Sequence, residues 1–554
     1  MTTVRAATFE LLRSRGVTTV FGNPGSTELP FLQDFPDDFR YVLGLQEAVV
    51  VGMADGYAQA TGRTALVNLH TAPGVGNAMG AIITAAANHT PMVVTAGQQV
   101  RAMMTMEALL TNVDATVLPR PAVKWAYEPP RAQDVPAALA RAFHLAETAP
   151  RGPVFLSLPM DDFDVELDEA EYAGALAAAR RRVHDGTAAA APAVQDLARR
   201  LAEAANPVLV TGGAIDAEGA WEAAVALAEH RRLPVWASPI EGRVGFPEDH
   251  PLYQGVLPPA LAPLAQTLAG HDLVLVVGAP VFRYYPYVPG PVLPDGAELV
   301  LLTSDPDEAA RAPVGDALVA GLRPTLELLT EVLEKKGGGD DGPADAAAGV
   351  TTAPTVAETG PGAQGAPAAD AAPEPMSAVD ALAAVASAAP PETVWVNESP
   401  SNVQAFRDHV RIDRPGSFLM TTGGGLGFGL AAAVGARLGR PDRPVVALVG
   451  DGSAQYAITA LWTAAAYRVP VTFVIPANRE YAILKWFGRF ENTPGVPGLD
   501  IPGIDLCALA RGYGVPAHRA TDAAHLAELV AAATTSPDGP VLIVAPITTV
   551  PPTL

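Results

Sequence analysis

Short apolar runs rich in β-branched residues alternate along the chain with longer Ala- and Leu-rich segments of helical spacing. Many of the short runs end directly in Gly or Pro, as in TTVFGNPGS, NPVLVTGGAID and RPVVALVGDGS. Fully apolar strands that alternate with helices are typical of parallel sheets covered on both faces. The pattern therefore predicts an α/β protein made of doubly wound parallel sheets.

The alternation forms three blocks, which predict domains over residues 1–180, 190–334 and 376–554. Residues 335–375, between the second and third blocks, are poor in large apolar residues and rich in Gly, Ala, Pro and acidic residues. A segment of this composition buries too little apolar surface to offset the entropy lost on ordering. We interpret it as a flexible linker, with a partly ordered surface loop as the alternative.

The net charge of the chain limits the kinds of molecule it is expected to bind. The 554 residues carry 36 Lys and Arg against 59 Asp and Glu, a net charge of −23. No Lys- or Arg-rich stretch offsets this charge, which argues against nucleic acid or an anionic membrane as a partner. The single cysteine, Cys507, rules out disulfides within the chain. The start has no signal-peptide pattern, and no apolar run approaches the roughly 20 residues of a membrane span. We therefore expect a soluble cytoplasmic protein.

The most specific chemical signal lies in residues 448–482, where one expected strand ends at Asp451 and the next ends near Asn478. In an open parallel sheet both ends face the same crevice, so the carboxylate and amide oxygens can converge. Two such oxygens and a main-chain carbonyl suit Mg²⁺ that completes its octahedral shell with phosphate oxygens. Gly450 and Gly452 let the backbone approach a diphosphate, whose charge the following helix N-terminus favours.

This stretch resembles the cofactor motif of the thiamine-diphosphate-dependent decarboxylases, and the three blocks resemble their pyrimidine-binding, middle and diphosphate-binding domains. Closer similarity, to the benzoylformate decarboxylase branch, is carried by FGNPGSTELPFLQDF, MTMEALLTNVDATVLPRP, GAPVFRYYPY and ALWTAAAYRVP. The resemblance covers the chain apart from the linker. It implies thiamine diphosphate and Mg²⁺ as cofactors.

For the cofactor, the resemblance implies that Glu47 hydrogen-bonds the aminopyrimidine ring and assists removal of the thiazolium C2 proton. Taken alone, Glu47 is more typical of a helix cap or a solvated residue, although a bare carboxylate in an apolar setting is costly unless paired or protonated. The implied metal ligands are Asp451, Asn478 and the main-chain carbonyl of Glu480. Further cofactor contacts are expected from Asn23, Ser401, Gly424, Leu426, Gly452, Ser453 and Tyr481.

For the substrate, the resemblance implies that Ser26 holds a carboxylate and that His70 transfers a proton. Taken singly, they are more typical of a helix cap and a structural histidine. Tyr285 stands where the family has a second active-site histidine, and a phenol with a pKa of about 10 is a poorer acid at neutral pH than imidazole. We expect the pocket walls to be Pro24, Met420, Ile483, Leu484 and Phe487, of which Met420 and Ile483 depart from the branch.

The resemblance implies a lyase that decarboxylates an aromatic 2-oxo acid, such as benzoylformate, to an aldehyde. Two alternatives stay open: a carboligase or 2-hydroxyketone lyase, and a non-catalytic relative that acts as a binding subunit. In this family the active sites are shared between two chains, so we expect an obligatory homodimer and, from two dimers, a homotetramer. The partner molecule is a small 2-oxo acid or aldehyde.

Overall fold

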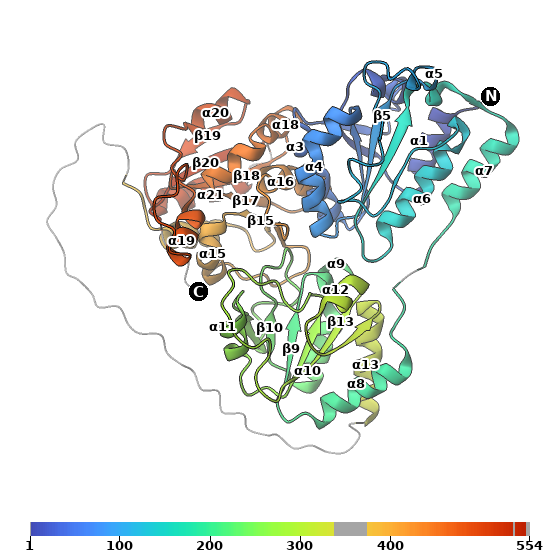
Figure 1. Cartoon of the computed structure of the whole chain (residues 1–554). Coiled ribbons are helices and arrows are strands. Elements are labelled where there is room, and N and C mark those ends of the chain that lie inside the picture. Colours follow the sequence, from blue (N-terminus) through green and yellow to red (C-terminus); the bar gives the residue numbers. More distant parts are fainter. Residues whose placement is uncertain (1, 185, 337–373, 536–537, 550–554) are drawn as a thin grey trace, which may run out of the picture.

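The computed structural model describes residues 2–184, 186–336, 374–535 and 538–549, which fold into three α/β domains (Figure 1). Each domain is built on one six-stranded sheet with parallel pairing throughout. The predicted fold class is confirmed. Every apolar run quoted above forms a strand, because a strand covered by helices on both faces must be apolar along its whole length.

The N-terminal domain has the strand order β3-β2-β4-β5-β7-β6. Its helices cover both faces of the sheet, and β1 pairs with β8 in a separate, short antiparallel sheet. Its strands are β1 (Thr2–Thr3), β2 (Thr19–Asn23), β3 (Arg40–Leu43), β4 (Ala65–Leu69), β5 (Met92–Gln98), β6 (Ala126–Tyr127), β7 (Pro153–Pro159) and β8 (Glu166–Leu167). Its helices are α1 (Val4–Ser14), α2 (Leu29–Leu32), α3 (Glu47–Thr61), α4 (Thr71–Ala87), α5 (Arg101–Met104), α6 (Val135–Glu147) and α7 (Glu169–Arg180).

The middle domain has the order β11-β10-β9-β12-β13-β14, with its first strand next to its fourth. Its strands are β9 (Pro207–Thr211), β10 (Val235–Ala237), β11 (Tyr253–Val256), β12 (Leu273–Val277), β13 (Glu298–Thr303) and β14 (Asp316–Val319). Its helices are α8 (Ala191–Glu203), α9 (Ala214–Ala217), α10 (Trp221–Arg231), α11 (Leu261–Thr267), α12 (Pro306–Arg311) and α13 (Leu322–Lys336). Residues 337–373, most of the predicted linker, lie outside the described residues.

The C-terminal domain has the order β16-β15-β17-β18-β20-β19. Its strands are β15 (Val394–Glu398), β16 (Phe418–Met420), β17 (Val445–Val449), β18 (Val471–Ala477), β19 (Ala517–Arg519) and β20 (Val541–Pro546). Its helices are α14 (Ala378–Ala388), α15 (Val403–His409), α16 (Gly429–Gly439), α17 (Asp451–Ala454), α18 (Ala460–Ala466), α19 (Ala482–Phe490), α20 (Leu506–Gly512) and α21 (Ala523–Thr535).

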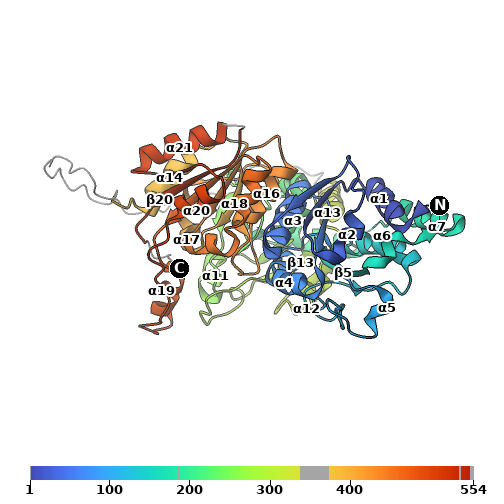
Figure 2. The ribbon, with the colours of Figure 1, turned by 90° about the horizontal axis from the view of Figure 1, so that it is seen from above.

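Helices α3 and α16 join the two terminal domains (Figure 2). A Cβ added to Gly56 of α3 would lie 2.1 Å from the carbonyl oxygen of Ala432, and one added to Gly435 of α16 would lie 1.8 Å from that of Met53. Only glycine permits so close an approach, so these domains meet through their helix backbones.

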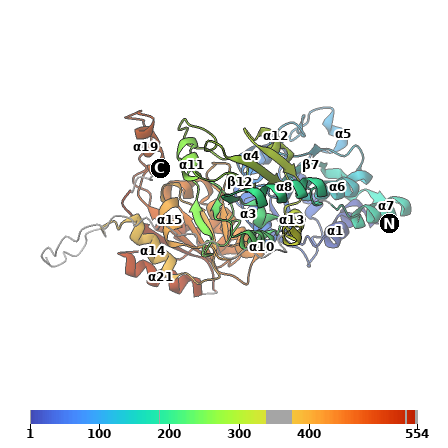
Figure 3. The same ribbon diagram turned by 90° about the horizontal axis from the view of Figure 1, so that it is seen from below.

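The middle domain lies across both terminal domains (Figure 3). On one side the Arg243 guanidinium donates to the carbonyl oxygen of Gln59 at 3.0 Å. On the other side the buried Glu248 accepts the main-chain N–H of Ile412 at 2.9 Å. Among the helices that the structure describes, none is long and apolar enough to cross a bilayer.

Candidate active site

The carboxyl ends of β2 and β4 bring Ser26 and His70 to one edge of the N-terminal sheet. Strand β2 leads into the single-turn 3₁₀ helix Ser26–Glu28, and His70 directly follows β4 as the N-cap of α4. Ser26 is exposed, and the His70 side chain is 22% exposed. Asn23, the last residue of β2, and Pro24 are half-buried on the same edge.

Glu28 belongs to this edge although no sequence pattern marked it. It is 1% exposed, and its Oε2 lies 2.9 Å from Nδ1 of His70. The same carboxylate accepts the main-chain N–H groups of Gly25 and Gly97, both at 2.8 Å, and the hydroxyl of Thr27. A Cβ added to Gly97 would lie 2.1 Å from Glu28 Oε1, so the carboxylate has no room to shift. Glu28 therefore fixes the histidine ring and leaves Nε2 as its free nitrogen.

Glu47 begins α3, where the helix dipole favours a carboxylate. Its Oε2 accepts from the Asn77 amide at 3.1 Å. A Cβ added to Gly74 would lie 3.6 Å from Glu47 Oε1 and 3.5 Å from the Cβ of His70, so both predicted acid–base groups flank the first turn of α4. Glu47 is half-buried and paired with an amide, which removes the desolvation cost that the apolar sequence context suggested.

Asp451 lies at the matching edge of the C-terminal sheet, directly after β17. It is 7% exposed, and it accepts the main-chain N–H groups of Gly452 at 2.9 Å and Arg479 at 2.6 Å. Burial raises the pKa of Asp451, although these hydrogen bonds oppose the shift. No Lys, Arg or His among the described residues forms an ion pair with it. A buried carboxylate without a counter-charge is the group that a bound cation would satisfy.

The other two predicted metal ligands follow β18. Asn478 lies beside the N–H group of Arg479 that Asp451 accepts, and its amide oxygen accepts the main-chain N–H of Glu480 at 3.2 Å. The Glu480 carboxylate is hydrogen-bonded to Lys485 and Thr549. Burial acts against ionisation of Glu480, but these partners outweigh it and lower its pKa. With the side chain engaged, the main-chain carbonyl is the group of Glu480 that is suited to a metal.

Residues 421–429, here called the Gly-rich segment, run from β16 to the start of α16. Gly424 has a φ of +71° and an added Cβ would meet nothing within 4 Å, so the segment is open at this point. Leu426 is half-buried. At its far end the segment is held by Glu398, the last residue of β15. Glu398 is the second acid that no sequence pattern marked.

Tyr285 of the middle domain reaches the C-terminal domain. Its ring lies 4.6 Å from that of Phe487 on α19, centroid to centroid, and the residue is 61% exposed. A predicted catalytic residue, Tyr285, and a predicted pocket residue, Phe487, are thus brought together from different domains. Ile483 and Leu484 lie on the same helix, and Leu484 is 47% exposed.

The remaining predicted residues lie on or near the C-terminal edge. Ser453 is buried in α17, and Ser401 lies in the 3₁₀ helix Pro400–Asn402. The Tyr481 ring fills the space beside Gly452, where an added Cβ would lie 2.6 Å from it. Met420 ends β16 and packs against the C-terminal core.

Among the described residues, no hydrogen bond or ion pair joins the N-terminal edge, with Ser26, Glu47 and His70, to the metal-ligand candidates Asp451, Asn478 and Glu480 of the C-terminal edge. Glu47 contacts α4 near Gly74 and Asn77. The Gly-rich segment contacts α4 near Thr84 and Ala87, which at 1.5 Å per residue is roughly 15 Å farther along the helix. Its far end also approaches α3, where a Cβ added to Gly52 would lie 3.7 Å from the carbonyl oxygen of Gly427. The two sets of predicted residues lie on separate sheet edges.

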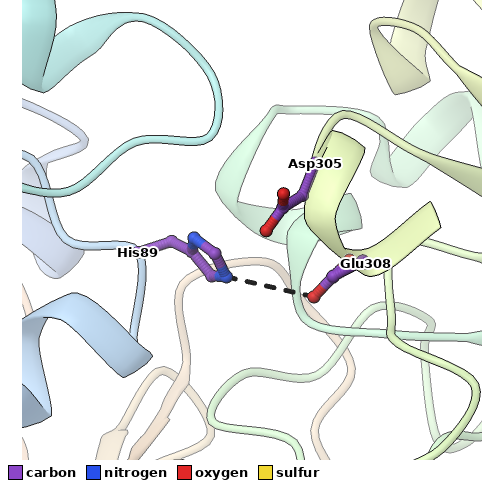
Figure 4. Close-up of side chains that lie close together, drawn as sticks. All are labelled: His89, Asp305 and Glu308. Carbon is purple, nitrogen blue, oxygen red and sulfur yellow. Dashed lines mark ion pairs between the residues drawn. The ribbon is translucent and has the colours of Figure 1, made fainter. Parts of the chain in front are cut away.

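A second cluster lies at the boundary of the N-terminal and middle domains (Figure 4). His89, Asp305 and Glu308 each offer an atom within 4.8 Å of the others. His89 Nε2 lies 3.9 Å from Glu308 Oε1, and an Arg311 nitrogen lies 3.7 Å from the same oxygen. Because a cation from the chain already faces this carboxylate, we interpret the cluster as a polar contact between domains.

Comparison with known proteins identifies all three domains. Residues 2–117 match the N-terminal TPP binding domain of thiamine pyrophosphate enzymes, residues 194–329 match the central domain, and residues 401–545 match the C-terminal TPP binding domain. Benzoylformate decarboxylase of Pseudomonas aeruginosa is 50% identical over 553 residues, covering 100% of both chains.

Solved structures agree over the same length. The thiamine diphosphate-dependent 4-hydroxybenzoylformate decarboxylase of Rhodococcus jostii RHA1 superposes with a TM-score of 0.90 at 46% identity, covering 99% of each chain. Benzoylformate decarboxylase from Polynucleobacter necessarius gives a TM-score of 0.90 at 41% identity, covering 100% of each. The chain belongs to the thiamine pyrophosphate enzyme family, as one of its thiamine-diphosphate-dependent 2-oxo acid decarboxylases.

Proposed function

We propose that this enzyme decarboxylates benzoylformate or a ring-substituted relative of it to the aldehyde, with Mg²⁺ as the metal. The observation that carries the proposal is that the chain has both kinds of group the reaction needs. Glu47 and His70 are acid–base groups on the N-terminal edge, and Asp451 is a buried carboxylate without a described ion-pair partner on the C-terminal edge. The names of the full-length relatives supply the substrate class. The proposal includes a cytoplasmic location.

The C-terminal edge is suited to hold the metal and the diphosphate. Asp451, the Asn478 amide and the Glu480 carbonyl would bind Mg²⁺, and Ser401, Gly452 and Ser453 would contact the diphosphate. Bound thiamine diphosphate supplies the carbanion chemistry and accepts the electron pair released with CO₂. Gly424 and Leu426 would lie against the cofactor rings, where the open space at Gly424 leaves room for them.

The N-terminal edge is suited to move protons. The Glu47 carboxylate would exchange a proton with a ring nitrogen of the aminopyrimidine, and it is free to do so because its described partner is a neutral amide. Ser26, exposed on this edge, would donate its hydroxyl hydrogen to the substrate carboxylate. With Nδ1 of His70 bonded to Glu28, Nε2 is the atom that would exchange a proton with the substrate.

We further propose a homodimer in which the N-terminal edge of one chain faces the C-terminal edge of the other, and a homotetramer of two such dimers. The placement of the predicted residues on two separate sheet edges, with no described hydrogen bond or ion pair between Glu47 or His70 and Asp451, supports this arrangement. Apolar side chains near the two edges are exposed on the single chain, as a partner surface requires: Leu45 (44%), Ile83 (52%) and Tyr456 (56%).

Two experiments test the proposal. Purified protein loaded with thiamine diphosphate and Mg²⁺ should release CO₂ from benzoylformate faster than from aliphatic 2-oxo acids, and the opposite preference would contradict the substrate class. For the shared site, two inactive variants, Glu47→Gln and Asp451→Ala, are unfolded together and refolded. A mixed dimer would contain one intact site, so activity should return. Continued inactivity of verified mixed dimers would place the whole site within one chain.

A carboligase activity is the second candidate, and the exposed Tyr285 favours it. A neutral phenol delivers a proton more slowly than an imidazolium. If Tyr285 supplies the proton for aldehyde release slowly, a second aldehyde would have more time to enter the site, so hydroxyketone should form beside aldehyde.

A further inference from the structure

The carboxylate of Glu398 is surrounded by the backbone of the Gly-rich segment. Its Oε1 accepts the N–H of Gly427 at 2.6 Å and that of Phe428 at 3.2 Å, while its Oε2 accepts the N–H of Gly429 at 2.7 Å. Three consecutive amides thus converge on one side chain. Glu398 is 3% exposed and ends β15 in the interior of the sheet, so its own backbone is fixed by neighbouring strands.

The fit around this carboxylate is tight. A Cβ added to Gly429 would lie 2.8 Å from the Cβ of Glu398 and 2.9 Å from its Oε2. Gly427 has a φ of +108°, and an added Cβ would lie 3.2 Å from the Cβ of Tyr456. The segment therefore turns sharply into α16 with its N–H groups directed inward, and Glu398 occupies the space they enclose.

We propose that Glu398 is a positioning residue for the cofactor, fixing the Gly-rich segment so that Gly424 and Leu426 are presented in one conformation. The inference rests on the proposed function, because that assigns these two residues to the cofactor. Glu398 itself does not need to touch the cofactor. Its effect passes through the three amides and the short stretch of backbone that precedes them.

The role requires a carboxylate and not merely a polar group. Both oxygens accept hydrogen bonds from N–H groups, and a glutamine offers only one oxygen. In Glu398→Gln, the NH₂ group would face the N–H of Gly429 or of Gly427, donor against donor. The segment should detach at one end, even though the variant side chain has nearly the same volume.

Hydrogen exchange on the whole protein without cofactor tests the contact directly. In Glu398→Gln, peptides that cover residues 424–430 should exchange at least about tenfold faster than in the parent, since opening of the segment would no longer break three hydrogen bonds. Peptides from β17 and α3 should keep their rates. An unchanged rate in the segment would overturn the inference.

Cofactor titration tests the consequence. With saturating Mg²⁺, Glu398→Gln should bind thiamine diphosphate at least about tenfold more weakly, the usual scale for a residue that orients ligating groups. The parent should also gain more in Tm on adding cofactor than the variant gains. Affinity within about twofold of the parent would reduce Glu398 to a structural role and overturn the inference.

Two further variants distinguish the proposed role of Glu398 from a general folding defect. Gly429→Ala keeps Glu398 but displaces its carboxylate by the close contact above, so it should reproduce both effects, and normal affinity in it would count against the proposal. Glu308→Gln removes another buried carboxylate, bonded to Thr303 in the middle domain, and should leave cofactor affinity unchanged. If the parent itself binds no thiamine diphosphate, the proposed function fails, while the exchange comparison still decides whether Glu398 holds the segment.

Discussion

The N- and C-terminal domains share one topology but differ in the hydrogen-bond partners of the carboxylates at the sheet edges that carry the predicted site residues. In each six-stranded sheet, the second strand in chain order is the edge strand beside the first. At the opposite edge, the fifth strand is the edge strand beside the sixth. On the N-terminal edge, side chains bind one another, as Glu28 binds His70 and Asn77 binds Glu47. On the C-terminal edge, Asp451 and Glu398 accept backbone amides instead. The same fold therefore carries two different kinds of site.

The difference has a chemical meaning. The Glu28 carboxylate also accepts backbone amides, but its bond to the His70 imidazole joins it to a group that can exchange a proton. The described hydrogen-bond partners of Asp451 and Glu398 are backbone amides, whose protons are not transferred, so these bonds fix the position of each carboxylate. We infer that the N-terminal edge handles protons and that the C-terminal edge holds charge.

The largest effect is expected on the charge-holding edge. Asp451→Ala should abolish Mg²⁺-dependent binding of thiamine diphosphate, because the diphosphate loses the metal that neutralises it. Isothermal titration with and without Mg²⁺ measures this. Asp500→Ala, which removes an exposed carboxylate paired with Lys485 in the same domain, is the matched control and should bind normally. Tight binding to Asp451→Ala that still needs Mg²⁺ would refute the metal assignment.

On the proton-handling edge, Glu47→Gln should lower kcat by at least about a hundredfold while cofactor affinity stays within a few-fold of the parent. An amide can hydrogen-bond the pyrimidine ring but cannot exchange a proton with it. Steady-state rates and a cofactor titration on the same preparation separate the two effects. Near-normal kcat would remove Glu47 from the proposed mechanism.

Glu28→Gln should act through His70 and cost about tenfold in kcat, less than loss of a group that exchanges the proton itself. A glutamine has one acceptor oxygen, so it cannot hold the His70 ring and still accept the N–H groups of both Gly25 and Gly97. Cofactor affinity and Tm should stay close to those of the parent while kcat falls, which a general folding defect would not produce. A lower Tm with an unchanged kcat would contradict this role.

Tyr285 gives a smaller effect, on products more than on rate. Tyr285→His should raise the ratio of aldehyde to hydroxyketone by a few-fold, because imidazolium supplies a proton more readily at neutral pH. Tyr285→Phe is the control that keeps the ring beside Phe487 and should lower the ratio or leave it unchanged. Product analysis with added acceptor aldehyde decides, and an unchanged ratio in Tyr285→His would leave only a steric role.

The smallest effect concerns stability and pH. Burial raises the pKa of Glu398 to about 7, against three opposing amide hydrogen bonds. Since this value lies above that of an unfolded glutamate, near 4.5, the folded state binds more protons between the two, and its stability falls as pH rises through that window. Glu398→Gln has no carboxyl to titrate at this position. The Tm of the variant minus the Tm of the parent should therefore rise from pH 5 to pH 7 and then level off. A constant difference would contradict the shift.

Much of the fold could be predicted from the sequence because the central strands have a distinctive composition. Central strands such as β12 and β17 are covered on both faces, so each is an unbroken apolar run. Edge strands such as β3 and β14 are short and partly polar, and nothing in their composition distinguishes them from loops. The residues that follow central strands, Asp451 among them, could therefore be predicted as site residues.

Glu28 and Glu398 could not be predicted, because their partners come from elsewhere in the chain. The Gly97 amide reaches Glu28 only when β5 lies beside β4, and the amides near Gly429 reach Glu398 only when α16 begins beside β15. A single acid outside any periodic pattern carries no signal of its role. The role of such an acid is set by tertiary structure alone.

The backbone contact between α3 and α16 also has a thermodynamic consequence. Small residues along this seam let two domains share one continuous buried core, which includes Val50 and Ala54 on one side and Ala431 and Val434 on the other. Neither half of that core is complete without the other, so the terminal domains should unfold as one cooperative unit despite the chain that separates them in sequence. The middle domain has its own core and is able to melt as a separate transition.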